Sequence, residues 1–203
     1  MHVPLPPSNL WPSGLYLKET PLATDEQDRA LVERYLENHQ DAAGALVDRY
    51  QQRLFNVALR MLGNVQDAED VTQTVFHNAF HKLRTYDPRY KFFSWIYRMT
   101  VNESLNLLKR RKPTDTLDDD LEVLAPGGRG GGAAADRADA EDRVGSALLS
   151  LKPDDRAVVV LKHFVSFSYQ EIADVLEIPV QTVKSRLFTA RERLRLALSE
   201  GVR

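Results

Sequence analysis

The chain has no cysteine, which excludes a disulfide framework and any catalytic or metal site built on thiolates. It also lacks an apolar run long enough to cross a membrane, and its first residues show no basic segment followed by an apolar core. We therefore expect a cytoplasmic protein without membrane insertion. Half of the ten glycines fall in the tract 127–132, which follows no strand pattern and therefore is not a phosphate-binding loop.

The small net charge of −2 hides an uneven distribution of charge along the chain. Residues 25–112 carry a net charge of +2, residues 113–142 carry −7, and residues 143–203 carry +3. The acidic middle segment also contains prolines and the glycine tract, a composition typical of a flexible tether. The predicted organisation is a Pro-rich leader (1–24), a first domain (25–112), a flexible linker (113–139) and a second domain (140–203).

Two amphipathic helical patterns joined by a tight turn lie between residues 168 and 198. Ser168 and Glu171 form the S-x-x-E pair that starts a helix by reciprocal capping. Pro179 suits the start of the second helix, whose apolar residues recur at helical spacing. These apolar residues are Val180, Val183, Leu187, Ala190 and Leu194. Glu177 stands in the turn where glycine often supports a left-handed backbone, so a strain of ~1 kcal/mol is expected.

The opposite face of this second helix is polar and cationic, with five basic residues against one acidic residue between 179 and 195. The small Ala173 allows the two helices to cross closely, and Ile178 can fill the gap between them. This is the layout of a DNA-binding helix-turn-helix, although an ordinary hairpin with solvated charges is the alternative. The residues predicted to face DNA are Gln181, Thr182, Lys184, Ser185, Arg186, Phe188 and Thr189.

The first domain reads as all-helical, with helices expected over 28–36, 41–62, about 66–83, and from a Ser94 cap to just before Pro113. Its third helix begins with three carboxylates, Asp67, Glu69 and Asp70. Carboxylates at a helix start favour its dipole by ~0.3–1 kcal/mol, which is one interpretation of their presence, and a functional role is the other. They do not converge on one face, so a metal site is disfavoured.

Aromatic and basic residues alternate from Lys82 to Arg98, around an expected loop at 86–93. Phe93 and Trp95 are expected in the core, but the segment holds more rings than a short loop can bury. Rings beside cations suit unstacked bases, with stacking worth ~1–3 kcal/mol per base. Arg98, Asn102 and Asn106 then form one polar stripe at intervals of four residues, whose side chains suit base edges. The predicted nucleic-acid contacts here are Tyr86, Tyr90, Phe92, Trp95, Arg98, Asn102, Asn106 and Lys109.

Sequence reasoning identifies no enzyme chemistry. No nucleophile lies in a recognisable arrangement with a base, so no catalytic residue and no cofactor are predicted. His77 and His81 are spaced to chelate a metal on one helix, but no third ligand accompanies them and no metal is predicted.

Taken in order, these motifs resemble those of the extracytoplasmic-function sigma factors of bacterial RNA polymerase, over about 25–112 and 143–198. The resemblance rests on DAED, on FFSWIYRMTVNESLNLLKRR and on SYQEIADVLEIPVQTVKSRLFTARERL. It implies an all-α protein of two small helical domains, a sigma-two bundle and a sigma-four helix-turn-helix. It also implies an alternative sigma factor that binds polymerase core, directs it to promoters and helps to melt the minus-ten element.

The same resemblance assigns roles to the residues already singled out. The β and β′ subunits are the implied partners, with Asp67, Glu69 and Asp70 docking on the clamp helices of β′. The loop from 86 to 93 would capture a flipped non-template base, and the stripe on the next helix would recognise and open the minus-ten element. Lys184, Ser185, Phe188 and Thr189 would read the minus-thirty-five element, although family members often carry arginine at the last position. The acidic linker would thread the RNA exit channel, and an anti-sigma factor is a further candidate partner that no residue identifies.

Two other classes of protein compete with this interpretation. A two-domain helix-turn-helix regulator acting on duplex DNA without polymerase explains 168–198, but not the aromatic loop or the acidic residues. A metal-dependent nuclease needs convergent carboxylates, which the spacing of the three acidic residues denies. Binding to core polymerase separates the sigma interpretation from both.

Overall fold

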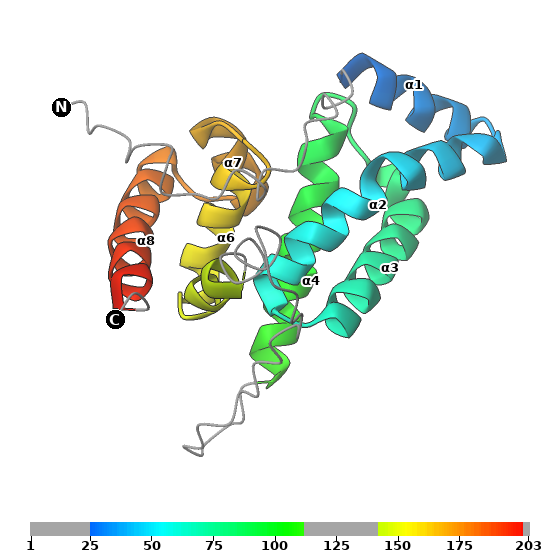
Figure 1. Cartoon of the computed structure of the whole chain (residues 1–203). Coiled ribbons are helices and arrows are strands. Elements are labelled where there is room, and N and C mark those ends of the chain that lie inside the picture. The colour runs from blue at the N-terminus through cyan, green and yellow to red at the C-terminus, as the bar shows by residue number, and fades with distance from the viewer. Residues whose placement is uncertain (1–24, 112–141, 201–203) are drawn as a thin grey trace, which may run out of the picture.

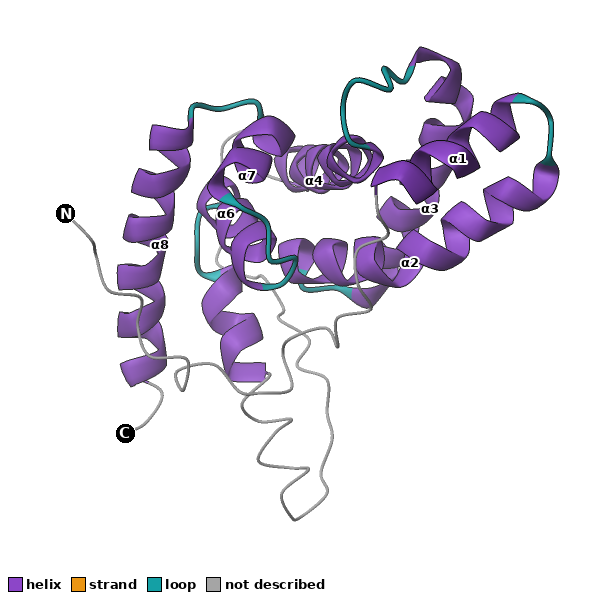
Figure 2. Ribbon diagram, turned by 90° about the horizontal axis from the view of Figure 1, so that it is seen from above, coloured by secondary structure: helices purple, strands orange, loops and turns teal. Residues whose placement is uncertain are grey.

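The computed structural model describes residues 25–111 and 142–200, and all of the regular structure in these two ranges is helical (Figure 1, Figure 2). This confirms the all-α prediction. The predicted leader and linker lie outside the described residues, and the domain boundaries stay predictions. In chain order the elements are α1 (Asp25–Leu36), α2 (Gln40–Leu62), α3 (Val65–Lys82), the 3-10 turn η2 (Leu83–Thr85), α4 (Phe92–Arg111), a helix over 142–149, α6 (Pro153–His163), α7 (Tyr169–Leu176) and α8 (Val180–Glu200).

Helices α1 to α4 pack into one bundle with α2 at its centre, in contact with each of the other three. The apolar face of α2 is buried along its whole length, through Leu46, Tyr50, Leu54 and Met61. Burying such a face, at about 25 cal/mol per Å² of apolar surface, is the main source of stability of a bundle of this kind.

A single buried carboxylate fixes α1 against α2. Asp28 is fully buried, accepting a hydrogen bond from Arg49 at 2.6 Å and another from the Tyr50 hydroxyl. Burial of Tyr50 and the neighbouring Asp28 charge both raise the pKa of this phenol, so it remains a hydrogen-bond donor at neutral pH. This network sets the position of α1, whose Arg29 contacts the loop before α4.

The turn between α2 and α3 is built from two adjacent residues with different tasks. Gly63 ends α2 in the left-handed conformation, with φ at 72°. A Cβ at this glycine would lie 2.5 Å from Leu149 Cδ1, so the position has little space for a side chain. The side chain of Asn64 then caps α3 by accepting a hydrogen bond from the Asp67 N–H at 3.0 Å.

Helix α4 begins earlier than the sequence predicts. Its first residue is Phe92, and the carbonyl of Lys91 accepts a hydrogen bond from the Trp95 N–H at 3.3 Å. Ser94 therefore lies inside the first turn and is buried, so the prediction that it caps this helix is wrong. Burial of Phe92 and Phe93 is the physical reason, because the chain must turn into the helix early enough to bring both rings into the core.

The helix-turn-helix forms as predicted from α7 and α8. Ser168 and Glu171 make both bonds of the capping box, and Glu177 adopts the left-handed conformation with φ at 54° and ψ at 42°. Ala173 is buried, and α7 and α8 are in contact. Helix α6, which the sequence analysis did not identify, supports both helices through a fully buried run from Ala157 to Leu161.

The two halves of the described chain share one core. The ring of Phe167 lies 5.2 Å from that of Phe93 and 5.1 Å from that of Tyr97, between ring centroids. Arg156, which is 6% exposed, donates to the carbonyl of Met61 in α2 and to that of Leu149 at 2.6 Å. Helices α6 and α7 therefore pack on α2 and α4, while α8 lies on their far side (Figure 1).

Candidate nucleic-acid and polymerase interface

Helix α8 separates a packing face from an exposed face, as the sequence predicts. Val183, Leu187, Ala190 and Leu194 are at most 2% exposed and pack toward α6 and α7. On the other side, the exposed residues include an aromatic ring, Phe188, which is 59% exposed. The exposed members of the predicted reading face are Gln181, Lys184, Ser185, Phe188 and Thr189.

Two predicted DNA contacts on α8 lie at the border between these faces. Thr182 and Arg186 are only partly exposed, and Arg186 reaches to within 4.0 Å of Asp154 at the start of α6. The Ser185 hydroxyl donates to the Thr182 carbonyl at 3.0 Å, which orients it on the exposed side. The reading face is therefore centred on Lys184, Ser185 and Phe188, with Arg186 at its edge.

A second polar surface follows α4. Asn102, Asn106 and Lys109 are exposed along one side of this helix, at the spacing of about one turn. Arg98 begins the same stripe but is only partly exposed, because it contacts α7. The opposite side of α4 is buried through Ile96, Tyr97 and Val101. The stripe thus has the rigid support that base recognition requires.

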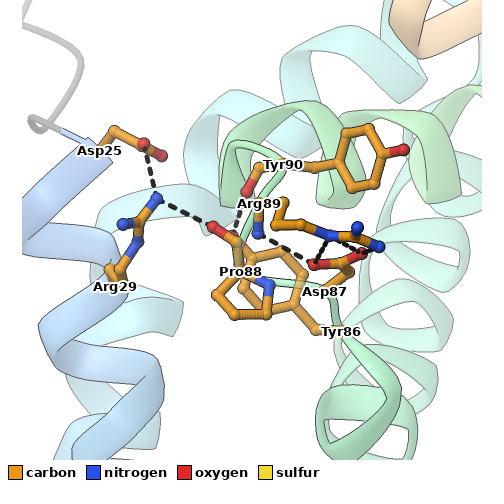
Figure 3. Close-up of polar contacts among 7 residues, drawn as sticks. All are labelled: Asp25, Arg29, Tyr86, Asp87, Pro88, Arg89 and Tyr90. Atoms are coloured by element: carbon orange, nitrogen blue, oxygen red, sulfur yellow. Dashed lines mark hydrogen bonds and ion pairs between the residues drawn. The ribbon is translucent and has the colours of Figure 1, made fainter.

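The loop before α4 is held in place by polar contacts at both ends (Figure 3). Arg29 of α1 donates to the Pro88 carbonyl at 2.8 Å, and Asp87 accepts from the Arg89 backbone at 3.0 Å (Figure 3). Tyr86 is buried and donates its hydroxyl to the Tyr90 carbonyl. Burial raises the pKa of Tyr86 to about 12, so the phenol keeps its proton.

Only some of the predicted aromatic residues are available to a base. Tyr90 is 64% exposed, and its ring extends away from the contacts that hold the loop (Figure 3). Phe92, in contrast, is 2% exposed, with its ring centroid 5.5 Å from that of Tyr50. Trp95 is half-buried against Tyr86 and Phe92. In this arrangement Tyr90 offers a stacking surface, while Tyr86 and Phe92 belong to the core beneath it.

The three carboxylates at the start of α3 separate into two kinds. Glu69 and Asp70 are exposed. Asp67 is 7% exposed and accepts hydrogen bonds from Arg111 on both oxygens, one of them at 2.5 Å. Asp67 therefore joins the start of α3 to the end of α4, and the outward negative charge comes from Glu69 and Asp70.

An apolar groove lies beside the exposed acidic residues, between α2 and α3. It encloses about 440 Å³. The rings of Phe55 and Phe76 line it, together with Val47 and Thr72, while Glu69 and Gln73 form part of its polar edge. Such a groove with a charged edge is suited to receive a helix from another protein.

Comparisons with known proteins agree on one family. The chain matches the family models for Sigma-70 region 2 at residues 46–114 and Sigma-70, region 4 at residues 141–194. It is 36% identical over 170 residues to the ECF RNA polymerase sigma factor SigW of Bacillus subtilis, covering 79% of this chain and 91% of the relative. It is 33% identical over 195 residues to the RNA polymerase sigma-H factor of Pseudomonas aeruginosa, covering 90% of this chain and 99% of the relative.

The chain belongs to the extracytoplasmic-function sigma factors. It is an RNA polymerase-binding alternative sigma factor, which removes the regulator without polymerase and the nuclease from consideration. Sigma factors bind RNA polymerase and promoter DNA, and they are not enzymes.

Solved structures share the fold of this sigma factor. CnrH, solved in complex with the cytosolic domain of CnrY, matches with a TM-score of 0.66 and 29% identity, over 85% of this chain and 97% of that chain. The sigma factor RpoE from Bartonella quintana, solved with the anti-sigma factor NepR, matches with a TM-score of 0.62 and 21% identity, over 77% of this chain and 96% of that chain.

Two further features of the described residues concern the histidine pair on α3 and the hydropathy of the helices. The rings of His77 and His81 meet edge to face with centroids 4.5 Å apart, and no three His, Cys, Asp or Glu side chains gather as metal ligands within residues 25–111 and 142–200. In these same ranges no helix is both long and apolar enough to span a membrane.

The most important contacts that sequence reasoning missed join the two DNA-reading halves. Arg98 of α4 donates to Glu177 at 2.8 Å and to the carbonyl of Asp174, both in the helix-turn-helix. Lys91 of the loop donates to Glu171 at 3.1 Å. Burial pushes the pKa of Glu171 upward, but its hydrogen bonds with Ser168 and Lys91 outweigh this and hold the pKa below its usual range. No local pattern could reveal these pairs, which are separated by 76 to 80 residues.

Proposed function

We propose that this sigma factor uses three separate surfaces during initiation. Glu69, Asp70 and the groove between α2 and α3 dock on the β′ subunit of core polymerase. The loop before α4 and the stripe on α4 recognise the minus-ten element and hold its non-template strand open. The exposed face of α8 reads the minus-thirty-five element in the major groove. The proposed sigma-two and sigma-four domains are residues 25–112 and 140–203.

The observation that carries this proposal is that the exposed acidic residues of α3 lie beside the apolar groove between α2 and α3. Outward carboxylates add nothing to binding of duplex DNA, because they oppose phosphate, so in a duplex-only binder they would serve the helix dipole alone. The same features suit a protein partner, where an apolar anchor supplies affinity and the charges select a basic surface. In this proposal Asp67 does not contact polymerase, because its carboxylate is already bound by Arg111. It supports the surface by joining α3 to α4.

The polar stripe on α4 and the loop beside it suit an opened strand. Unstacking a base step costs ~1.4 kcal/mol on average, so several steps exceed what a small domain supplies alone. One captured base on an exposed ring returns ~1–3 kcal/mol. Tyr90 provides such a ring, and Asn102 and Asn106 provide donors and acceptors. Polymerase contacts supply the remaining free energy.

The chain itself performs no chemistry in this proposal. Nucleotidyl transfer belongs to the polymerase, and the sigma factor contributes recognition and strand capture. Its site of action is the cytoplasm, where it associates with the nucleoid once it is bound to polymerase. An anti-sigma factor is the remaining partner in the proposal.

Charge reversal on α3 tests the docking surface. We expect Asp70→Lys to weaken binding to purified core polymerase about tenfold or more, because like charges placed opposite one another cost several kcal/mol. Its thermal unfolding should match that of the wild type, since Asp70 is exposed and its one side-chain hydrogen bond, from Gln66, spans 3.4 Å. Glu33→Lys on α1 is the matched control, an equal charge change at an exposed position away from the groove. Equal affinities of Asp70→Lys and wild type for core polymerase would remove this surface from the proposal.

A further inference from the structure

The loop before α4, residues 86–91, has one peptide unit that is held at both of its edges. The carbonyl of Pro88 accepts a hydrogen bond from the Arg29 guanidinium at 2.8 Å (Figure 3). The N–H of Arg89, which belongs to the same peptide unit, donates to the Asp87 carboxylate at 3.0 Å. Because a peptide unit is planar, bonds at its C=O and at its N–H together fix its orientation.

Tyr90 follows this peptide unit directly, and its own backbone is also held. Its N–H donates to the Asp87 carbonyl at 3.0 Å, and its carbonyl accepts from the Tyr86 hydroxyl. The backbone therefore sets the point and direction from which the exposed ring leaves the loop. The ring extends away from the contacts that hold the loop (Figure 3). The stacking surface is thus presented by a backbone that is ordered before any base arrives.

Of the three side chains that make these bonds, only that of Arg29 comes from outside the loop. Arg29 lies on α1, next to Asp28, whose buried carboxylate is bound by Arg49 and Tyr50 of α2. Its guanidinium also donates to the Asp25 carboxylate, one turn earlier, at 3.4 Å (Figure 3). Arg29 therefore ties the loop to a helix whose position the bundle core fixes.

Stability alone does not account for the bond between Arg29 and Pro88. Pro88 is exposed, so water can satisfy its carbonyl without a donor from the protein. The Arg29 side chain is 45% exposed, and polar contacts of so exposed a side chain add little to the free energy of unfolding. What the bond does determine is the direction of the Pro88 carbonyl, and with it the path of the chain into Tyr90.

We propose that Arg29 is a positioning residue for capture of the non-template strand, because it holds the loop in the conformation that presents the Tyr90 ring to a base. A loop that is already ordered loses less conformational entropy when a base binds, so more of the stacking free energy appears as affinity. Arg29 does not contact the base itself and acts through Tyr90. This role rests on the proposed function of the loop, in which Tyr90 stacks on a base of the opened strand.

Variants of the full chain separate positioning from other roles of Arg29. Arg29→Gln removes the guanidinium and its charge, whereas Arg29→Lys keeps a cationic donor on a side chain of similar length. Arg34→Gln is the matched control, because Arg34 is similarly exposed on α1 but pairs with Asp41 of α2. Each version is also made in combination with Tyr90→Ala, which removes the ring that Arg29 is proposed to position.

Two measurements are compared, one of them without DNA. In the free chain, amide hydrogen exchange at Arg89 and Tyr90, followed by NMR, reports how firmly the loop is held. With core polymerase added, the affinity for a promoter template with a pre-melted minus-ten region reports capture of the opened strand. We expect Arg29→Gln to speed exchange at both amides and to weaken this affinity, each about two- to tenfold, the factor that corresponds to one hydrogen bond. Arg29→Lys should restore both, and Arg34→Gln should match the wild type.

The combined variants decide whether Arg29 acts through the ring. In the Tyr90→Ala background, Arg29→Gln should weaken the affinity no further, because the two residues act on the same step. An equal loss of affinity with and without the ring would mean that Arg29 contacts DNA directly, and would overturn the inference. Unchanged exchange or unchanged affinity in Arg29→Gln would also overturn it. If Tyr90→Ala alone binds the template as tightly as the wild type, the proposed capture by this ring is refuted instead, and the exchange rates still show whether Arg29 holds the loop.

Discussion

Substitutions on the two faces of α8 should have different effects. A substitution on the packing face should lower stability, and one on the exposed face should weaken promoter recognition. Leu187 is 1% exposed and lies at the centre of the packing face, while Lys184, three residues earlier, is exposed. Leu187→Ala removes buried methyl groups and leaves a cavity, at a cost of ~2–5 kcal/mol. For a protein of this size each kcal/mol lowers Tm by about 2–4 °C, so Tm should fall by roughly 4–20 °C. Lys184→Ala loses no buried contact and should change stability by less than about 0.5 kcal/mol.

The assay combines thermal unfolding of the full chain, followed by circular dichroism, with transcription from the cognate promoter by core polymerase. We expect Lys184→Ala to keep its Tm and its affinity for core polymerase but to reduce promoter-specific transcription. If Lys184 contacts a base edge, preference at one promoter position should relax, whereas a phosphate contact should weaken all sequences alike and reduce the salt slope. The reasoning is refuted if Lys184→Ala unfolds at a lower temperature, or if it transcribes as well as the wild type.

Two further predictions concern other parts of the molecule. Asn102→Ala, at an exposed position on α4, should slow promoter opening on duplex DNA more than on a template with a pre-melted bubble, and equal slowing on both would exclude a role in melting. The second prediction concerns His163, where burial, assisted by Arg191 and Lys162, lowers the pKa to about 4. The unfolded chain takes up this proton near pH 6.5, so stability should fall by about 2 kcal/mol between pH 7 and pH 5. His163→Gln should lose less stability over that interval in denaturant titrations, and an unchanged pH dependence would contradict the assigned cause.

Local sequence signals were sufficient to predict the helix-turn-helix. The Ser168–Glu171 capping pair and the repeat of Val183, Leu187 and Leu194 depend only on residues within a few turns of one another. The left-handed backbone at Glu177 was likewise expected from its place in the turn. In these cases the physical cause lies within the segment that carries the signal.

Contacts between distant segments could not be predicted in the same way. In the sequence Asp67 resembles the other two carboxylates, Glu69 and Asp70. In the structure it is bound by Arg111, which lies 44 residues later in the chain. Helix α6 gave no amphipathic signal because Ala157 to Leu161 are buried without interruption, so no polar face marks its period. The start of α4 was misplaced because Ser94 has the chemistry of a cap, while burial of Phe92 decides where the helix begins.

The most direct test of the central claim is transcription by purified bacterial core polymerase on a fragmented genomic library, with and without this sigma factor. The account predicts that the sigma factor binds the core enzyme and directs initiation to a small set of start sites that share two upstream elements. Charge reversal at Asp70 should reduce all of these transcripts alike by weakening core binding, and Lys184→Ala should reduce them without weakening core binding. Start sites that do not change when the sigma factor is added, or a chain that does not bind the core enzyme, would contradict the account.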